Sequence, residues 1–304
     1  MPMKKLFISI LSLGIFVVWG CNSIITNSNS DIATSVATTK NLDVSYGTDS
    51  DTQKMDIYIP EWTGPFPVII AIHGGAFMMG NKEGGDLQPM LQAVKKWYAV
   101  VTVNYRLSNE AKFPAAIDDI QKAIVFIKEN AKAYNLNGDK IATWWDSAWG
   151  NLASLAGTMW NIKDNTDVQA VVDRFGPIYF STMDEEFTAL WVTPKMGNTN
   201  SPNSPESKYL WQTIGTQEAE VLVKQASPQT YISKNSPAFF IQHGTLDTNI
   251  PITQSENFAE KLKNVIGDEN VIFEKIEWAA HWWAQFETEE NLNKVFNFLD
   301  TYLK

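Results

Sequence analysis

The 304-residue chain is poor in cysteine, histidine, glycine and positive charge. Its single cysteine excludes an intrachain disulfide framework and a cysteine-rich zinc site. Its 17 glycines fall below the usual share of about 7%. Acidic residues outnumber basic ones, 34 to 24, and no cluster of lysine and arginine stands out, so we expect no nucleic-acid partner. Tryptophan is abundant instead, with 12 residues.

The first residues predict a targeting segment. Lys4 and Lys5 precede an apolar run, Leu6–Val18, that is too short to span a bilayer comfortably. A short positive start followed by such a run is typical of a secretory signal peptide. We expect residues 1–20 to be this signal and the mature chain to leave the cytoplasm.

The residue that follows, Cys21, resembles the lipidated cysteine of bacterial lipoproteins. Trp19 departs from that pattern, because a small residue is usual there. We expect a membrane lipid anchor on Cys21 that holds the chain at the cell envelope, with an ordinary signal peptide as the alternative. Residues 21–40, which are rich in serine, threonine and asparagine, predict a flexible tether.

From residue 41 the chain alternates between strand and helix patterns, and 44% hydrophobic residues suffice for one large core. Strands are predicted over Asp56–Ile59, Val68–His73, Ala99–Tyr105, Lys140–Trp144, Val168–Arg174, Ala238–His243 and Val271–Ile276. Helices are predicted over Leu87–Lys96, Ala115–Tyr134, Leu152–Met159, Ser255–Val265 and Asn291–Leu303. This alternation predicts a mostly parallel central sheet with helices on both faces. Residues 181–236 break it and predict a small cap insertion in one domain, 41–304.

A candidate nucleophile lies where the strand ending at Trp144 runs into a helical pattern. Ser147 occupies the centre of a strand-to-helix turn, where its hydroxyl would be exposed beside backbone amides at the helix start. The pattern G-x-S-x-G is usual for this turn, but Trp145 and Trp149 stand at both glycine positions. On this segment alone, a serine that caps an ordinary helix is the better interpretation.

Three further segments favour the nucleophile. Gly74 and Gly75 follow a predicted strand and, with the amide of Ala148, can form an oxyanion hole. Asp247 follows a later strand, and His281 comes before the last helix, so the order Ser, Asp, His is that of α/β-hydrolases.

The other two histidines are less suited to be the base. His73 belongs to the oxyanion turn and His243 to the strand end before the acid, which leaves His281. The histidine spacing fits no ligand pattern, so we expect no metal and no organic cofactor.

Several segments together resemble the hormone-sensitive-lipase-like esterases, most closely their bacterial carbohydrate-esterase-like branch, over residues 42–304. They are Asp56–Pro60, His73–Phe77, Val103–Leu107, Phe113–Ala116, Asp146–Ala148 and His243–Asp247. The resemblance implies the α/β-hydrolase fold and hydrolysis of short-chain acyl esters, with acetyl or feruloyl groups on polysaccharides as candidate substrates. It assigns Ser147 as nucleophile, His281 as base and Asp247 as the residue that orients His281.

Six tryptophans lie where this family has glycine, namely Trp97, Trp145, Trp149, Trp278, Trp282 and Trp283. Trp62 lies in a turn that would suit glycine, and Trp19 lies in the lipoprotein pattern where a small residue is usual. An indole at the tightest turn of the fold would cost several kcal/mol, because overpacking by even a methylene-sized group costs about 1–3 kcal/mol. We hypothesise that these residues are misdecoded glycines, since the UGA triplet is read as glycine in some bacteria and as tryptophan in other codes.

Two alternatives stay open at this point. If Trp145 and Trp149 are genuine, the chain is a catalytically inactive hydrolase-fold binding protein whose indoles could stack on sugar rings. A serine peptidase of the prolyl-oligopeptidase type shares the fold and the residue order, but residues 22–41 are too few for its usual propeller domain. A glycosidase has no carboxylate pair placed by a motif here.

Overall fold

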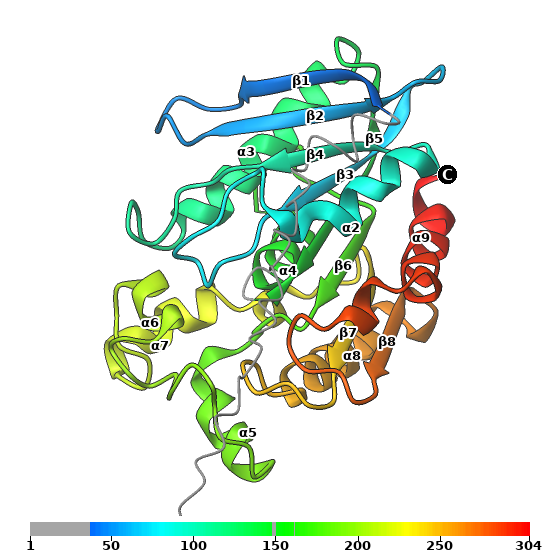
Figure 1. The fold of residues 1–304 in the computed structure, drawn as a ribbon. Helices are drawn as coiled ribbons and strands as arrows, with labels where there is room; N and C mark the ends of the chain where they lie inside the picture. Colours follow the sequence, from blue (N-terminus) through cyan, green and yellow to red (C-terminus); the bar gives the residue numbers. More distant parts are fainter. Residues whose placement is uncertain (1–36, 148–149, 161) are drawn as a thin grey trace, which may run out of the picture.

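The computed structural model describes residues 37–147, 150–160 and 162–304, which build an eight-stranded sheet (Figure 1). The strand order is β1-β2-β4-β3-β5-β6-β7-β8. Strands β1 and β2 pair antiparallel, as do β2 and β4, and the remaining pairs are parallel. The bounds are β1 Ala37–Ser45, β2 Lys54–Pro60, β3 Phe66–Ile72, β4 Ala99–Val103, β5 Leu136–Asp146, β6 Ala170–Arg174, β7 Ala238–Gly244 and β8 Val271–Ile276.

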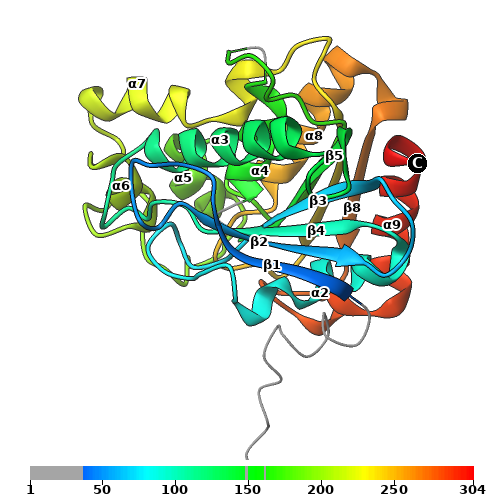
Figure 2. The same ribbon diagram turned by 90° about the horizontal axis from the view of Figure 1, so that it is seen from above.

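Helices cover both faces of this sheet. Figure 2 shows α3, α4 and α8 on one face and α2 and α9 on the other. The α-helices are α2 Gln88–Leu91, α3 Ala115–Asn130, α4 Gly150–Thr158, α5 Met183–Ala189, α6 Pro205–Leu210, α7 Gln217–Gln225, α8 Thr253–Ile266 and α9 Glu289–Leu303. The short 3₁₀ helices are η1 Gly85–Leu87, η2 Gln92–Lys96, η4 Phe180–Thr182, η5 Pro228–Tyr231, η6 Asp268–Asn270 and η7 Ala284–Glu287. The predicted parallel sheet between helical layers is confirmed.

The sequence patterns explain where each element lies. Every residue of β4 is buried, as is nearly all of β3, because both strands are continuous apolar runs in the middle of the sheet. Strand β8 is an edge strand and is only partly buried. In α3, Ile117, Ile120 and Ile124 recur every three or four residues and form the buried stripe that faces the core.

The structure corrects the predictions at two places. Strand β1 begins at Ala37, so residues 37–40 belong to the sheet and not to the predicted tether. The single helix predicted over Leu87–Lys96 is η1, α2 and η2 in succession. Pro89 lies in the first turn of α2, where its missing N–H prevents α-helical bonding to the preceding turn.

The segment between β6 and β7, where the cap insertion was predicted, contains α5, α6 and α7. These helices lie beyond the end of the sheet in Figure 1. Within the ranges that the structure describes, no helix combines the length and apolarity needed to cross a membrane. Cys21 lies outside those ranges, so the anchor remains a prediction.

Candidate active site

The serine turn is strained in the way that a nucleophile requires. Strand β5 ends at Asp146, and Ser147 has a φ of 75°, in the left-handed region. That conformation costs an L-residue about 1–2 kcal/mol, so the surrounding structure has to hold it. Helix α4 then begins at Gly150, while Ala148 and Trp149 lie outside the described residues.

Gly150 shows how tightly this turn is packed. A Cβ atom there would lie 2.3 Å from Oδ1 of Asp173 and 2.6 Å from Cα of Gly176. Helix α4 therefore approaches the end of β6 closely enough that no side chain fits at its first residue.

The three residues predicted for the triad lie together. Oγ of Ser147 is 2.6 Å from Nε2 of His281, and Nδ1 of His281 is 2.6 Å from Oδ2 of Asp247. These residues follow three different strands, β5, β7 and β8, whose carboxyl ends lie at one edge of the sheet. The arrangement is an unbroken hydrogen-bond path from hydroxyl to imidazole to carboxylate.

The carboxylate of Asp247 is held ionised. Burial raises its pKa, but His281 and His243 outweigh that effect and hold the pKa well below its usual value. Its Oδ1 also accepts the backbone N–H groups of Asn249 and Ile250, at 2.7 and 3.1 Å. Asp247 is therefore an acceptor fixed toward His281 at neutral pH.

The other two histidines lie near the site but not at Ser147: Nε2 of His243 is 3.4 Å from Oδ2 of Asp247, and His73 precedes the oxyanion loop. His243 contacts Oγ of Ser255 through Nδ1, at 2.7 Å, and the carbonyl of Ile250 through Nε2, at 3.1 Å. His73 is buried and stacks on Tyr105 with ring centres 4.6 Å apart. Burial lowers the pKa of His73 to about 4, so it is neutral at pH 7. Neither competes with His281 for Ser147. Among the residues described, no cluster of three or more histidine, cysteine or acidic side chains could hold a metal ion.

The comparisons with known proteins identify the family. The BD-FAE family model matches residues 55–262. The chain belongs to the BD-FAE family.

Other comparisons agree with the BD-FAE assignment. Esterase LipQ of Mycobacterium tuberculosis is 27% identical over 250 residues, 79% of this chain and 56% of that protein. The chain thus spans about half the length of the curated relatives it matches. The structure of "Bifunctional GH43-CE" from Bacteroides eggerthii is 30% identical with a TM-score of 0.76, and covers 86% of this chain and 35% of that one. The structure of a "truncated form of carbohydrate esterase from gut microbiota" is 25% identical with a TM-score of 0.76, and the match covers 88% of this chain and 96% of that one. The predicted α/β-hydrolase fold is confirmed.

The predicted oxyanion loop of this BD-FAE chain follows β3. Gly75 has a φ of 131°, and a Cβ there would lie 2.2 Å from the carbonyl oxygen of Met79, so only glycine fits. The N–H of Gly74, by contrast, already donates to the carboxylate of Asp86. The amide of Gly74 is thus engaged within the protein in this structure, and its role as an oxyanion donor stays a prediction. Ala148 lies outside the described residues, so its role stays a prediction.

Two side chains next to the site were missed at the level of sequence. Asp86 contacts the oxyanion loop from η1, and burial raises its pKa. Arg174, at the end of β6, is fully buried with Nη1 3.5 Å from Oδ2 of Asp146. Its guanidinium lies 5.2 Å from the ring centre of Trp144 and 5.9 Å from that of Phe286. Neither residue belongs to a motif, and each meets the site only through folding.

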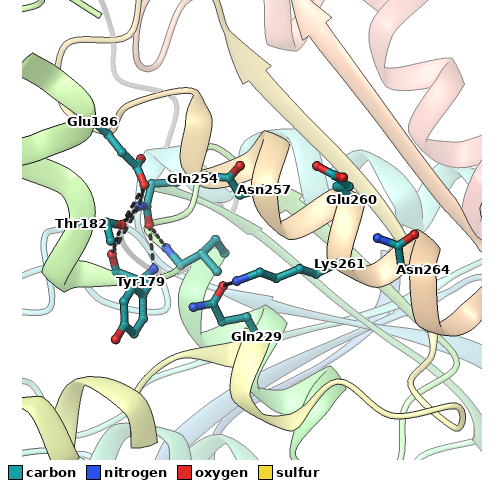
Figure 3. Close-up of a pocket in the computed structure, with 10 residues that line it drawn as sticks. Tyr179, Thr182, Glu186, Gln229, Gln254, Asn257, Glu260, Lys261 and Asn264 are labelled. Carbon is teal, nitrogen blue, oxygen red and sulfur yellow. Dashed lines mark hydrogen bonds between the residues drawn. The ribbon is translucent and has the colours of Figure 1, made fainter. Parts of the chain in front are cut away.

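A polar pocket of about 400 Å³ lies beside α8, away from these residues (Figure 3). Gln254 joins its walls, since its Oε1 accepts the N–H groups of Ile178 and Tyr179 and its Nε2 donates to Glu186 at 2.9 Å. None of the three triad residues lines this pocket. Its contacts tie α8 to the segment after β6.

Proposed function

We propose that this BD-FAE chain is a serine carboxylesterase that hydrolyses short-chain acyl esters through an acyl-enzyme on Ser147. The observation that carries the proposal is the hydrogen-bond path from Ser147 through His281 to Asp247. Its supports include the family, the curated esterase among its relatives and the low pKa of Asp247.

The proton movements follow from the two distances. Because the ionised Asp247 accepts the Nδ1–H of His281, the Nε2 lone pair faces Ser147 and can take its proton. Oγ of Ser147 then bonds to the ester carbonyl carbon and the carbonyl oxygen becomes an oxyanion. His281 gives its proton to the alcohol oxygen as the ester C–O bond breaks, which leaves the acyl group on Ser147.

Hydrolysis of the acyl-enzyme uses the same two proton transfers through His281, with water as the attacking group. His281 takes a proton from water, whose oxygen bonds to the acyl carbon, and returns it to Oγ of Ser147 as the carboxylic acid leaves. For the oxyanion, Gly75 and Ala148 are the proposed amide donors, since the Gly74 N–H is engaged with Asp86. No metal or organic cofactor takes part in this scheme.

For the substrate we propose acetyl or feruloyl esters on polysaccharides. Support comes from the names of two structural neighbours, a bifunctional GH43-CE protein and a carbohydrate esterase from gut microbiota. The acidic chain, with a net charge of −10, gives no reason to expect an anionic polymer.

The test has to separate the nucleophile from the tryptophans at its turn. The chain as written and a Trp145→Gly, Trp149→Gly double variant are assayed on p-nitrophenyl acetate, acetylated xylan and methyl ferulate, with Ser147→Ala in each background as the control. We expect turnover that Ser147→Ala abolishes, and a fluorophosphonate label on the Ser147 peptide by mass spectrometry. If both backgrounds bind xylan without turnover or labelling, the chain is the inactive binding protein.

We also propose that Cys21 carries a lipid that anchors the chain to the bacterial envelope. The support is the sequence pattern before Cys21, with residues 21–36 available to join the anchor to β1. Metabolic labelling with an alkyne fatty acid should mark the wild type and not Cys21→Ser. Equal labelling of both would reject the anchor.

A further inference from the structure

Five tryptophans adopt a backbone conformation that is typical of glycine. Trp97, Trp191, Trp211, Trp278 and Trp282 have φ angles between 53° and 70°. The described residues include ten of the twelve tryptophans, all except Trp19 and Trp149. The five are therefore half of the tryptophans whose backbone is described. A left-handed φ is uncommon for any residue with a Cβ and an outlier for a bulky one.

Other aromatic residues of the same chain provide an internal control. The described residues include 23 of the 25 phenylalanines and tyrosines, all except Phe7 and Phe16. Only two of these 23, Phe77 and Phe175, are left-handed. The left-handed conformation is therefore a property of the tryptophan positions and not of large aromatic side chains in this fold.

Three of these positions end helices. Trp97 is the C-cap of η2, Trp211 is the C-cap of α6, and Trp191 follows the C-cap of α5 by one residue. The N–H of Trp97 bonds back to the carbonyl of Val94 at 3.3 Å, and that of Trp211 to the carbonyl of Lys208 at 3.3 Å. A left-handed residue that closes a helix in this way is most often glycine, since glycine adopts it without a steric penalty.

The side chains of the five tryptophans do not compensate for the strain. Their exposed fractions run from 42% for Trp282 to 96% for Trp191, so none of them is a core side chain. Three have specific contacts: Trp97 stacks on Trp62, the indole N–H of Trp211 donates to the carbonyl of Ser108, and the ring of Trp282 lies edge-on to those of Phe175 and His281. They also do not form one binding surface, because Trp97 follows η2 and Trp191 follows α5, at distant ends of the molecule (Figure 1).

Trp144 shows what an ordinary tryptophan looks like here. It lies in strand β5, is fully buried, and packs against Phe296 with ring centres 5.7 Å apart and against the guanidinium of Arg174. Its backbone and its side chain both suit tryptophan, unlike those of the five.

We propose that the source organism makes this chain with glycine at the five left-handed positions, from a UGA codon that it reads as glycine. For Trp145 and Trp149 at the serine turn we propose the same codon from the sequence pattern alone, because Trp145 is buried in β5 without a left-handed φ and Trp149 lies outside the described residues. The left-handed φ angles add Trp191 and Trp211 to the positions proposed as glycine, although the sequence alone did not single them out. Trp144 is not among these positions, because its φ is not left-handed. The proposal does not depend on the esterase activity.

The codons and the native protein test it directly. We expect UGA at positions 97, 191, 211, 278 and 282 and UGG at 144, with glycine in the corresponding peptides of the protein purified from its own host and analysed by mass spectrometry. A single UGG among the five, or one native peptide with tryptophan there, would overturn the proposal.

Recombinant variants give a physical readout that needs no host. Trp→Gly at the five positions together should raise the melting temperature of the written chain, because each glycine removes backbone strain. The matched control, Trp144→Gly, should lower it by opening a core cavity. A lower melting temperature for the five-position variant would show that these residues suit tryptophan and would contradict the proposal.

Discussion

The two sides of the candidate site are built by different means. On the acid–base side, the side chains of Asp247 and His281 meet through a hydrogen bond, and their loops also approach closely, since a Cβ at Gly244 would lie 2.3 Å from the carbonyl oxygen of Ala279. On the nucleophile and oxyanion side, Ser147, Gly75 and Gly150 depend on left-handed or closely packed backbone. Both sides therefore need glycine at a close approach, but only the nucleophile itself is left-handed, because neither Asp247 nor His281 has a positive φ.

Removing the group that joins the two sides should have the largest effect. Ser147→Ala takes away the nucleophile and leaves the His281–Asp247 pair in place. We expect kcat on p-nitrophenyl acetate to fall on the order of 10⁴-fold or more. Unchanged circular dichroism and melting temperature serve as the folding control, and residual activity above a tenth of the parent would reject Ser147 as the nucleophile.

Asp247→Asn tests the acid–base side alone. Asparagine can turn its NH2 group toward Nδ1 of His281, and this favours the tautomer that cannot take the proton of Ser147. We therefore expect kcat to fall by about 10⁴-fold. The neighbouring imidazole of His243, 3.4 Å from Asp247, gives the matched control. His243→Gln should cost far less activity, and an equal loss in both variants would mean that Asp247 acts through the stability of its loop.

The nucleophile side is tested by gain of activity. Trp145→Gly with Trp149→Gly should raise kcat/KM by about 10²–10³-fold, the usual worth of an oxyanion donor. Trp145→Ala with Trp149→Ala controls for the loss of indole bulk alone. If the alanine pair gains as much as the glycine pair, close backbone approach is not what limits the turn.

Sequence could predict what local patterns and residue order encode. The alternation of strands and helices led to the parallel sheet, and the order Ser147, Asp247, His281 led to residues that do lie together. Contacts between distant segments could not be predicted in this way. Asp86 and Arg174 carry no motif, and they meet the site only because η1 and β6 fold against it.

Backbone conformation was the other missing information. Strand β1 was missed because its residues, ATTKNLDVS, lack a regular apolar alternation, and pairing with β2 decides its structure. Trp191 and Trp211 looked ordinary in sequence and stand out only by φ. A residue pattern indicates which side chains are present, whereas the left-handed positions appear only when the helix ends are known.

The contact of Asp86 with the oxyanion loop should have a smaller effect. Because Asp86 accepts the N–H of Gly74, its removal leaves the loop before Gly75 without that anchor. We expect Asp86→Ala to lower kcat about tenfold with little change in KM, an effect of one charge-assisted hydrogen bond. Asp86→Asn keeps an acceptor and should recover most of the rate. If KM rises instead and kcat is unchanged, Asp86 contacts the substrate and does not position the loop.

The last prediction concerns stability and not activity, and it comes from His73, which lies just before the same loop. Burial lowers its pKa to about 4, against about 6.5 when unfolded, so between these values the unfolded chain binds more protons. The free energy of unfolding should therefore fall as the pH drops from about 6.5 to about 4, by roughly 3 kcal/mol from this group. Asp146 acts in the opposite direction, because burial raises its pKa to about 7. The measurement is thus the difference between parent and His73→Gln in urea unfolding at pH 7 and pH 4.5. The variant should lose less stability than the parent on acidification, and an equal loss would mean that His73 takes up a proton without penalty in the folded chain.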